Sequence, residues 1–198
     1  MSGNRKGARR IPLVNAILER PMRTLVLAAA GLLAATTAVA QSNDAPVDVN
    51  IAGATATIKN LAGENVGSAS LRMTPSGIMV ITASVSGLTQ GWHGFHIHET
   101  GECDPATEFK SAGGHLADGK EHGPLVEGGP HPGDMPNQMV QETGVMVAEV
   151  FNHLLTEDML FDADGSAIMI HSGRDDYQSQ PSGDAGGRVA CGVIERPQ

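Results

Sequence analysis

Histidine side chains are concentrated in one stretch of this chain, between positions 93 and 134. The stretch reads HGFHIHETGECDPATEFKSAGGHLADGKEHGPLVEGGPHPGD and holds six of the eight histidines in the sequence. These six are His93, His96, His98, His115, His122 and His131. A seventh, His171, lies further along in an apolar segment, and only His153 matches no pattern. Imidazole is the commonest side-chain metal ligand, so this density predicts a metal site.

Two of these histidines have the spacing of neighbours on one face of a strand. If residues 95–98 are extended, Phe95 and Ile97 point to the core, while His96 and His98 point to the opposite face. Their Cα atoms then lie about 7 Å apart. That separation lets both rings converge on one ion at bonds of about 2 Å. A lone H-x-H also occurs on solvated strands, so this pair is a weak signal by itself.

A second set of candidate ligands lies on a polar, glycine-rich segment. It consists of His115, His122, His131 and Asp134. Three ring nitrogens and one carboxylate oxygen make a closed tetrahedral shell that suits Zn²⁺. The alternative is a solvated polar loop that binds nothing.

The remaining pattern predicts an all-β fold. Alternating or β-branched segments predict strands over 54–59, 65–73, 79–85, 92–98, 142–150, 166–171 and 188–194. Gly, Asn and Ser clusters separate them, and no segment has convincing helical periodicity. Short strands with turns between them favour an antiparallel sandwich or barrel. Two polar segments, 99–138 and 172–187, interrupt the strands, and we expect them to be long functional loops.

The first forty residues predict a secretory signal peptide rather than part of the domain. From Met22 the chain has a basic start, then an apolar run, and then Ala38-Val39-Ala40. A membrane-spanning helix is the alternative, but the run is shorter than the roughly 18 apolar residues that a span needs. We therefore expect cleavage after Ala40, a domain over 41–198, a periplasmic location and no membrane contact after cleavage. The true start is either Met1 or Met22.

The net charge and the two cysteines limit the possible partners and the cellular compartment of the protein. Residues 41–198 hold seven Lys and Arg against 21 Asp and Glu, a formal net charge of −14. So acidic a chain repels phosphate backbones, which argues against a nucleic-acid partner. An exported protein with two cysteines is expected to pair them in an oxidising compartment, here Cys103 with Cys191. The alternative is two unrelated thiols, which could serve as metal ligands.

Several motifs together resemble one known family. HGFHIHETGEC, SAGGH, KEHG, HPGD, DADGSAIMIH and GDAGGRVACGVI occur in the order found in secreted bacterial copper,zinc superoxide dismutases, and the resemblance covers nearly all of 47–195. It implies an eight-stranded Greek-key β-barrel, an immunoglobulin-like sandwich. It also implies an enzyme that converts two superoxide anions and two protons to O₂ and H₂O₂ by alternate reduction and oxidation of copper. Such an enzyme holds one copper and one zinc ion per subunit, as a monomer or homodimer.

The resemblance also implies roles for individual residues. Copper would take His96, His98, His115 and His171, and zinc would take His115, His122, His131 and Asp134. His115 would thus bridge both ions as an imidazolate. Asp175 would link a copper histidine to a zinc histidine, and His93 would be a packed structural histidine. Arg188 would hold superoxide beside copper. From their place in the two long polar segments, Lys110, Lys120 and Arg174 are candidate helpers in attracting the anion.

The chain departs from the family pattern at two places. His115 is followed by Leu-Ala-Asp instead of an aromatic residue, Asn and Pro, and its spacing to His122 is one residue shorter. Pro181 and Ser182 stand where many relatives have a lysine. The alternative function is an exported copper/zinc-binding or buffering protein on the same scaffold, without turnover. Because all the copper ligands and Arg188 are present, we expect the enzyme.

Overall fold

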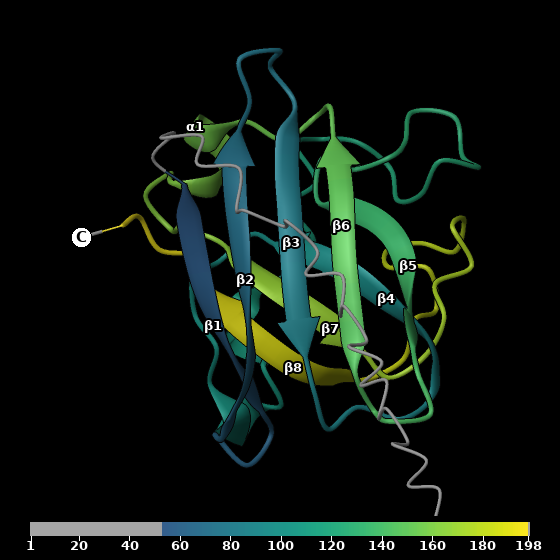
Figure 1. Cartoon of the computed structure of the whole chain (residues 1–198). Helices are drawn as coiled ribbons and strands as arrows, with labels where there is room; N and C mark the ends of the chain where they lie inside the picture. The colour runs from purple at the N-terminus through teal and green to yellow at the C-terminus, as the bar shows by residue number, and fades with distance from the viewer. Residues whose placement is uncertain (1–52, 198) are drawn as a thin grey trace, which may run out of the picture. The chain divides into compact units, whose positions relative to one another are not determined.

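The computed structural model describes residues 53–197, which form eight antiparallel strands closed into one barrel (Figure 1). The strands are β1 (Ala54–Asn60), β2 (Asn65–Met73), β3 (Met79–Val85), β4 (Gly91–His98), β5 (Asp134–Val140), β6 (Met146–Asn152), β7 (Ala167–His171) and β8 (Arg188–Val193). The predicted signal peptide at 1–40 lies outside the described residues.

The strand order gives the Greek-key connectivity that was predicted. Around the barrel the order is β1-β2-β3-β6-β5-β4-β7-β8. β4, β5 and β6 are neighbours in sequence and in space, and β7 returns to pair with β4. A strand that returns to lie beside the first of three consecutive strands defines a Greek key. The closed order pairs every strand on both sides, so the all-β barrel prediction is confirmed.

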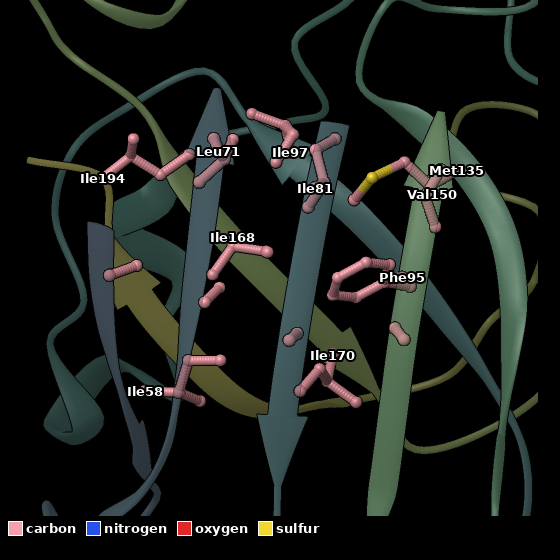
Figure 2. Packing of buried hydrophobic residues seen from close by; sticks show 14 of the residues in the cluster. Ile58, Leu71, Ile81, Phe95, Ile97, Met135, Val150, Ile168, Ile170 and Ile194 are labelled. Atoms are coloured by element: carbon pink, nitrogen blue, oxygen red, sulfur yellow. The ribbon is translucent and has the colours of Figure 1, made fainter. Parts of the chain in front are cut away.

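The barrel interior is built from alternate residues of the strands. In β3, Met79, Ile81, Ala83 and Val85 are all buried, as period two predicts. A row of small side chains crosses four neighbouring strands in register: Ala56, Ala69, Ala83 and Ala148. Small residues leave room in the same cluster for bulkier ones, among them Phe95, Ile168 and Ile170 (Figure 2). The core is therefore largely aliphatic, with little aromatic packing.

One strand was missed and another was misplaced. The sequence assigned 134–138 to a loop, yet β5 begins at Asp134 and pairs with β4 from Gly91↔Val140 to His96↔Asp134. Its sequence DMPNQMV contains Pro136 and Asn137, which are poor strand formers, so propensity hid it. The strand predicted over 142–150 is β6, which begins four residues later, after a turn that contains Gly144.

Two long connections lie outside the strands, and the first of them carries His115, His122 and His131. Residues 99–133 join β4 to β5 and contain two 3₁₀ turns, η1 (Pro105–Thr107) and η2 (Lys110–Ala112). Residues 172–187 join β7 to β8. The α-helix in the described part of the chain is a single turn, α1 (Glu157–Leu160). Across residues 53–197 there is no helix with the length and apolarity to cross a membrane.

Candidate metal centre

β4 brings two histidines to the outer face of the barrel. Phe95 and Ile97 belong to the core cluster, whereas His96 and His98 do not, as strand alternation requires. His98 forms an isolated bridge with His115 of the long β4–β5 connection. Gly133 has no side chain, and a Cβ there would collide with the Ile97 carbonyl, so the connection can pack directly on β4. These contacts bring His115 to the strand.

Four buried histidines form the first cluster, and one ring nitrogen from each lies within 4.8 Å of the others. They are His96, His98, His115 and His171. The Nε2 atoms of His98 and His171 lie 3.4 Å apart. The opposite nitrogen of each ring faces a backbone acceptor: His98 Nδ1 lies 3.0 Å from the Gly113 carbonyl, and His171 Nδ1 lies 3.3 Å from the Gly186 carbonyl. Donation to these carbonyls leaves both inner nitrogens with free lone pairs.

Two nitrogens of this cluster have no protein partner. His96 Nδ1 and His115 Nε2 are buried, and neither makes a hydrogen bond with any of residues 53–197. The other nitrogen of each ring is engaged, His96 Nε2 with Asp175 and His115 Nδ1 with Asp134. Buried polar atoms are normally satisfied, so two orphans facing one cluster call for a ligand. Four imidazole nitrogens suit copper better than they suit oxygen-seeking cations.

The second cluster centres on one oxygen of Asp134. Its Oδ1 atom lies 2.9 Å from His115 Nδ1, 3.0 Å from His122 Nδ1 and 3.2 Å from His131 Nδ1. In a tetrahedral zinc site with bonds of about 2.0 Å, ligand atoms lie about 3.3 Å apart. The other oxygen, Oδ2, accepts the backbone N–H groups of Gly123 and His131. The carboxylate is therefore fixed at the spacing of a zinc shell.

Asp175 connects the two clusters. It is 1% exposed, and its Oδ2 lies 2.7 Å from His96 Nε2 while its Oδ1 lies 3.1 Å from His122 Nε2. Oδ1 also accepts the backbone N–H of Tyr177 at 2.6 Å. One carboxylate therefore orients a ring of each cluster, which is how outer carboxylates fix ligating histidines.

The two clusters differ in their electrostatics. Burial lowers the pKa of His171 to about 3 and that of His115 to about 4, and it holds the pKa of His98 well below its ordinary value. Burial also opposes a charge on His122, yet hydrogen bonds to Asp134 and Asp175 raise its pKa to about 9. His98, His115 and His171 are thus neutral and ready to ligate, whereas His122 must lose a proton to do so.

The two acids at these sites are held ionised. Burial alone would raise their pKa values, but hydrogen bonds from His115 and His122 hold the pKa of Asp134 far below its usual range. Hydrogen bonds from His122 and His96 do the same for the pKa of Asp175. Both carboxylates are therefore anionic at any physiological pH.

Arg188, at the start of β8, borders a cleft above the first cluster. Its Nη1 and Nη2 atoms donate to the carbonyls of Phe109 and Gly113, each at 2.6 Å. The cleft is lined by His98, Gly114, His115, His171, Pro181, Ser182, Gly186 and Arg188. The Gly113 carbonyl thus anchors both His98 and the guanidinium. A fixed cation beside a four-histidine cluster can hold a small anion there.

The predicted disulfide is confirmed. Cys103 and Cys191 are bonded across 88 residues, with their Cα atoms 5.7 Å apart. Cys191 belongs to a small buried cluster that includes Phe109, and the partly buried Cys103 packs against it. The bridge therefore anchors the segment whose carbonyls hold Arg188.

The other singled-out residues lie away from these clusters. Lys110 pairs with Glu108 at 2.9 Å on the surface, and Arg174 lies over the ring of Trp92 at 6.0 Å. Lys120 and His153 are exposed.

His93 is buried on β4. One ring nitrogen lies 2.5 Å from the His171 carbonyl and the other 2.8 Å from the Thr89 carbonyl. It therefore braces the backbone of a histidine in the first cluster without facing that cluster.

Sequence reasoning missed the groups that hold the site residues. The carbonyl anchors Phe109 and Gly113 leave no trace in residue type. The side chain of Asn137 also forms hydrogen bonds with the backbone of Asp175, and that of Gln180 with the backbone of His122. Asn137 lies three residues after Asp134, and this proximity was the one available signal.

Comparisons with known proteins agree with this geometry. The family model described as copper/zinc superoxide dismutase (SODC) matches residues 65–194. Superoxide dismutase [Cu-Zn] 2 of Aquifex aeolicus is 47% identical over 142 residues, which is 68% of this chain and 82% of that protein. A superoxide-dismutase-like protein from Bacillus subtilis has a similar structure, with a TM-score of 0.65, 35% identity and coverage of 70% of this chain and 96% of that one. The Cu/Zn superoxide dismutase of Brucella abortus gives a TM-score of 0.59, 29% identity and coverage of 72% and 99%.

Proposed function

We propose that the two clusters hold copper and zinc side by side, because this chain belongs to the copper/zinc superoxide dismutase family and is a superoxide dismutase. Copper would be bound by His96, His98, His115 and His171, and zinc by His115, His122, His131 and Asp134. We propose one ion of each kind per subunit.

The observation that carries this proposal is the position of His115. Its Nδ1 lies 2.9 Å from Asp134 in the second cluster, while its Nε2 is buried without a partner and belongs to the first. One five-membered ring therefore belongs to both clusters. A ring can ligate through both nitrogens only when it is deprotonated, which two neighbouring cations make feasible.

Copper, when bound, supplies the one-electron chemistry that oxidises one superoxide to O₂ and reduces a second to H₂O₂, while zinc has no redox chemistry. The protein's own residues do the rest. The Arg188 guanidinium, fixed by two carbonyls, attracts and orients the superoxide anion in the cleft. His115 lines the same cleft, and its Nε2 can carry a proton to the reduced product, because Nδ1 stays engaged beside Asp134.

Attraction of an anion by so acidic a chain has to be local. The body over 41–198 carries −14, yet the cleft itself presents neutral histidines and one arginine. Charges separated by more than about 8 Å are largely screened at physiological salt, so Arg188 dominates inside the cleft. With Pro181 and Ser182 on its wall, the cleft has no second fixed cation among the residues that line it.

We also propose that residues 1–40 are a secretory signal peptide and that the domain 41–198 acts in the periplasm. The basic start, the apolar run and the Ala38-Val39-Ala40 ending support this, and the disulfide fits an oxidising compartment. N-terminal sequencing of the exported protein tests it, with Gln41 expected as the first residue. A first residue that lies upstream of Met22 would refute it.

A substitution separates turnover from simple metal binding. In Arg188→Ala, we expect unchanged copper and zinc content and a loss of dismutase activity of about tenfold to a hundredfold, the value of one charge-assisted contact. Arg174→Ala is the matched control, since it removes an arginine that lies over Trp92 and does not line the cleft. A metal-buffering protein would be indifferent to both changes. Full activity in Arg188→Ala would refute the assigned role.

A further inference from the structure

Two side-chain amides clamp the contact that joins the metal clusters. Asn137 of β5 donates from Nδ2 to the Asp175 carbonyl and accepts the Asp175 N–H at Oδ1, both at 2.8 Å. Gln180 donates from Nε2 to the His122 carbonyl and accepts the His122 N–H at Oε1, both at 2.9 Å. His122 and Asp175 meet each other at 3.1 Å. Each end of that contact is therefore held by one amide.

We propose that Gln180 is a positioning residue for His122 and that it keeps this histidine in place for zinc. The inference rests on the proposed function, in which His122 is a zinc ligand. A pair of hydrogen bonds to the N–H and C=O of one residue fixes the peptide planes on both sides of its Cα. Those planes set the direction of the His122 Cα–Cβ bond, and Asp134 and Asp175 then hold the two ring nitrogens. The clamp spans 58 residues and joins the two long connections.

The neighbouring backbone is built to accept this arrangement. Gly183 has φ of +69°, and a Cβ at that position would collide with Asp175 Oδ1 and with His122 Nε2. The connection therefore passes close over the His122–Asp175 contact only because a glycine stands there. Three residues earlier in the chain, Gln180 makes its hydrogen bonds to His122. Pro181 and Ser182, between them, line the cleft, so the clamp ties the cleft wall to the zinc side.

The two amides should differ in what they protect. Of the residues in the two clusters, Gln180 holds His122 alone, whereas Asn137 holds Asp175, which contacts both His96 and His122. Loss of the Gln180 amide should therefore weaken zinc binding and spare copper. Loss of the Asn137 amide should weaken both.

The experiment measures metal loss from the loaded, disulfide-bonded protein. Zinc and copper release into separate chelators is followed for wild type, Gln180→Ala, Asn137→Ala and a control, Gln178→Ala. The Gln178 side chain makes no hydrogen bond with any of residues 53–197, and its carbonyl, which accepts from Gln180, is kept in alanine. In Gln180→Ala we expect zinc release about tenfold faster and copper release within about twofold of wild type. Gln178→Ala should match wild type.

Two further measurements make the outcome decisive. Gln180→Glu keeps the acceptor for the His122 N–H but loses the donor, so zinc release should be intermediate. The unfolding midpoint of the metal-free protein should be unchanged in Gln180→Ala, because the side chain is exposed. Unchanged zinc release in Gln180→Ala would overturn the inference, as would equal acceleration of copper release or equal zinc release from Gln178→Ala. A wild-type protein that takes up no zinc would instead refute the zinc assignment itself.

Discussion

Replacement of Asp175 by asparagine should weaken both metal sites at once. The carboxylate accepts from His96 Nε2, from His122 Nε2 and from the Tyr177 N–H. Asparagine offers one oxygen and one NH₂ group, so it cannot accept from both rings. One histidine N–H would face another donor in a site where the residue is 1% exposed.

The size of the effect follows from that geometry. A buried donor left without an acceptor costs about 1–3 kcal/mol, and the lost negative charge adds to it. Replacement of an outer partner of a metal ligand typically lowers metal affinity by about tenfold to a hundredfold, which is the same range. We therefore expect Asp175→Asn to bind zinc and copper at least about tenfold more weakly than wild type.

Competition titration against chelators of known affinity, followed by elemental analysis, measures both affinities. Asp176→Asn is the matched control, since this neighbouring carboxylate is exposed and accepts only from Gln178 and Ser179. Zinc affinity within about twofold of wild type in Asp175→Asn would refute the reasoning, because the linkage would then contribute nothing to ligand orientation. An equal loss in Asp176→Asn would show that the effect is not specific to the link.

Two other predictions concern the disulfide and the metal-free protein. Cys103→Ser removes the bridge to Cys191, and for a loop of 88 residues the chain-entropy relation gives about 4–5 kcal/mol of lost stability, measurable by urea unfolding; an unchanged unfolding midpoint would contradict it. The metal-free protein should lose stability as pH falls below 6.5, because His115 and His171 have lowered folded pKa values of about 4 and 3 and the unfolded chain binds their protons first. Each group costs about 1.4 kcal/mol per pH unit in that range. His122, with its raised pKa, acts in the opposite sense: its contribution is complete below pH 6.5 and is lost as pH rises through 9, so it does not offset the decline. Urea unfolding at pH 7, 6 and 5 checks this, and a flat profile would show that these rings are not held neutral by burial.

The sequence predicted the strands whose hydrophobic pattern is unambiguous. β2 and β3 match the predicted ranges because one face of each strand is apolar and turn residues bound it. β5 was not predicted because it contains Asp134, Pro136 and Asn137, which are rare in strands. Asp134 belongs to the second cluster and Asn137 holds Asp175, so these positions are occupied by residues for the site rather than for strand propensity.

The candidate ligands could be proposed from residue type, but the groups that orient them could not. A histidine in a sequence indicates a possible ligand. The Gly113 carbonyl accepts from both His98 and Arg188, but nothing in the residue type indicates that role. The sequence alone also could not show how the shorter spacing between His115 and His122 affects the position of these two side chains. In the fold, Leu116 enters the core cluster, its backbone pairs with Ile97, and both His115 and His122 still reach Asp134. Such compensation depends on long-range contacts that local patterns do not contain.

The charges around His115 explain which of its two ring nitrogens faces each cluster. The anionic carboxylate of Asp134 holds His115 Nδ1, so in the metal-free protein the proton of the neutral ring belongs on Nδ1. Nε2 is then left as a lone pair in the first cluster, where the other three rings are also held with their outer nitrogens on protein acceptors. A copper-type cation therefore meets four ready lone pairs, whereas a zinc-type cation must first displace protons from His115 and His122. It follows that zinc uptake should release more protons and depend more steeply on pH than copper uptake does. The difference arises because hydrogen bonds to Asp134 and Asp175 hold a proton on His122, whereas burial keeps His98, His115 and His171 neutral.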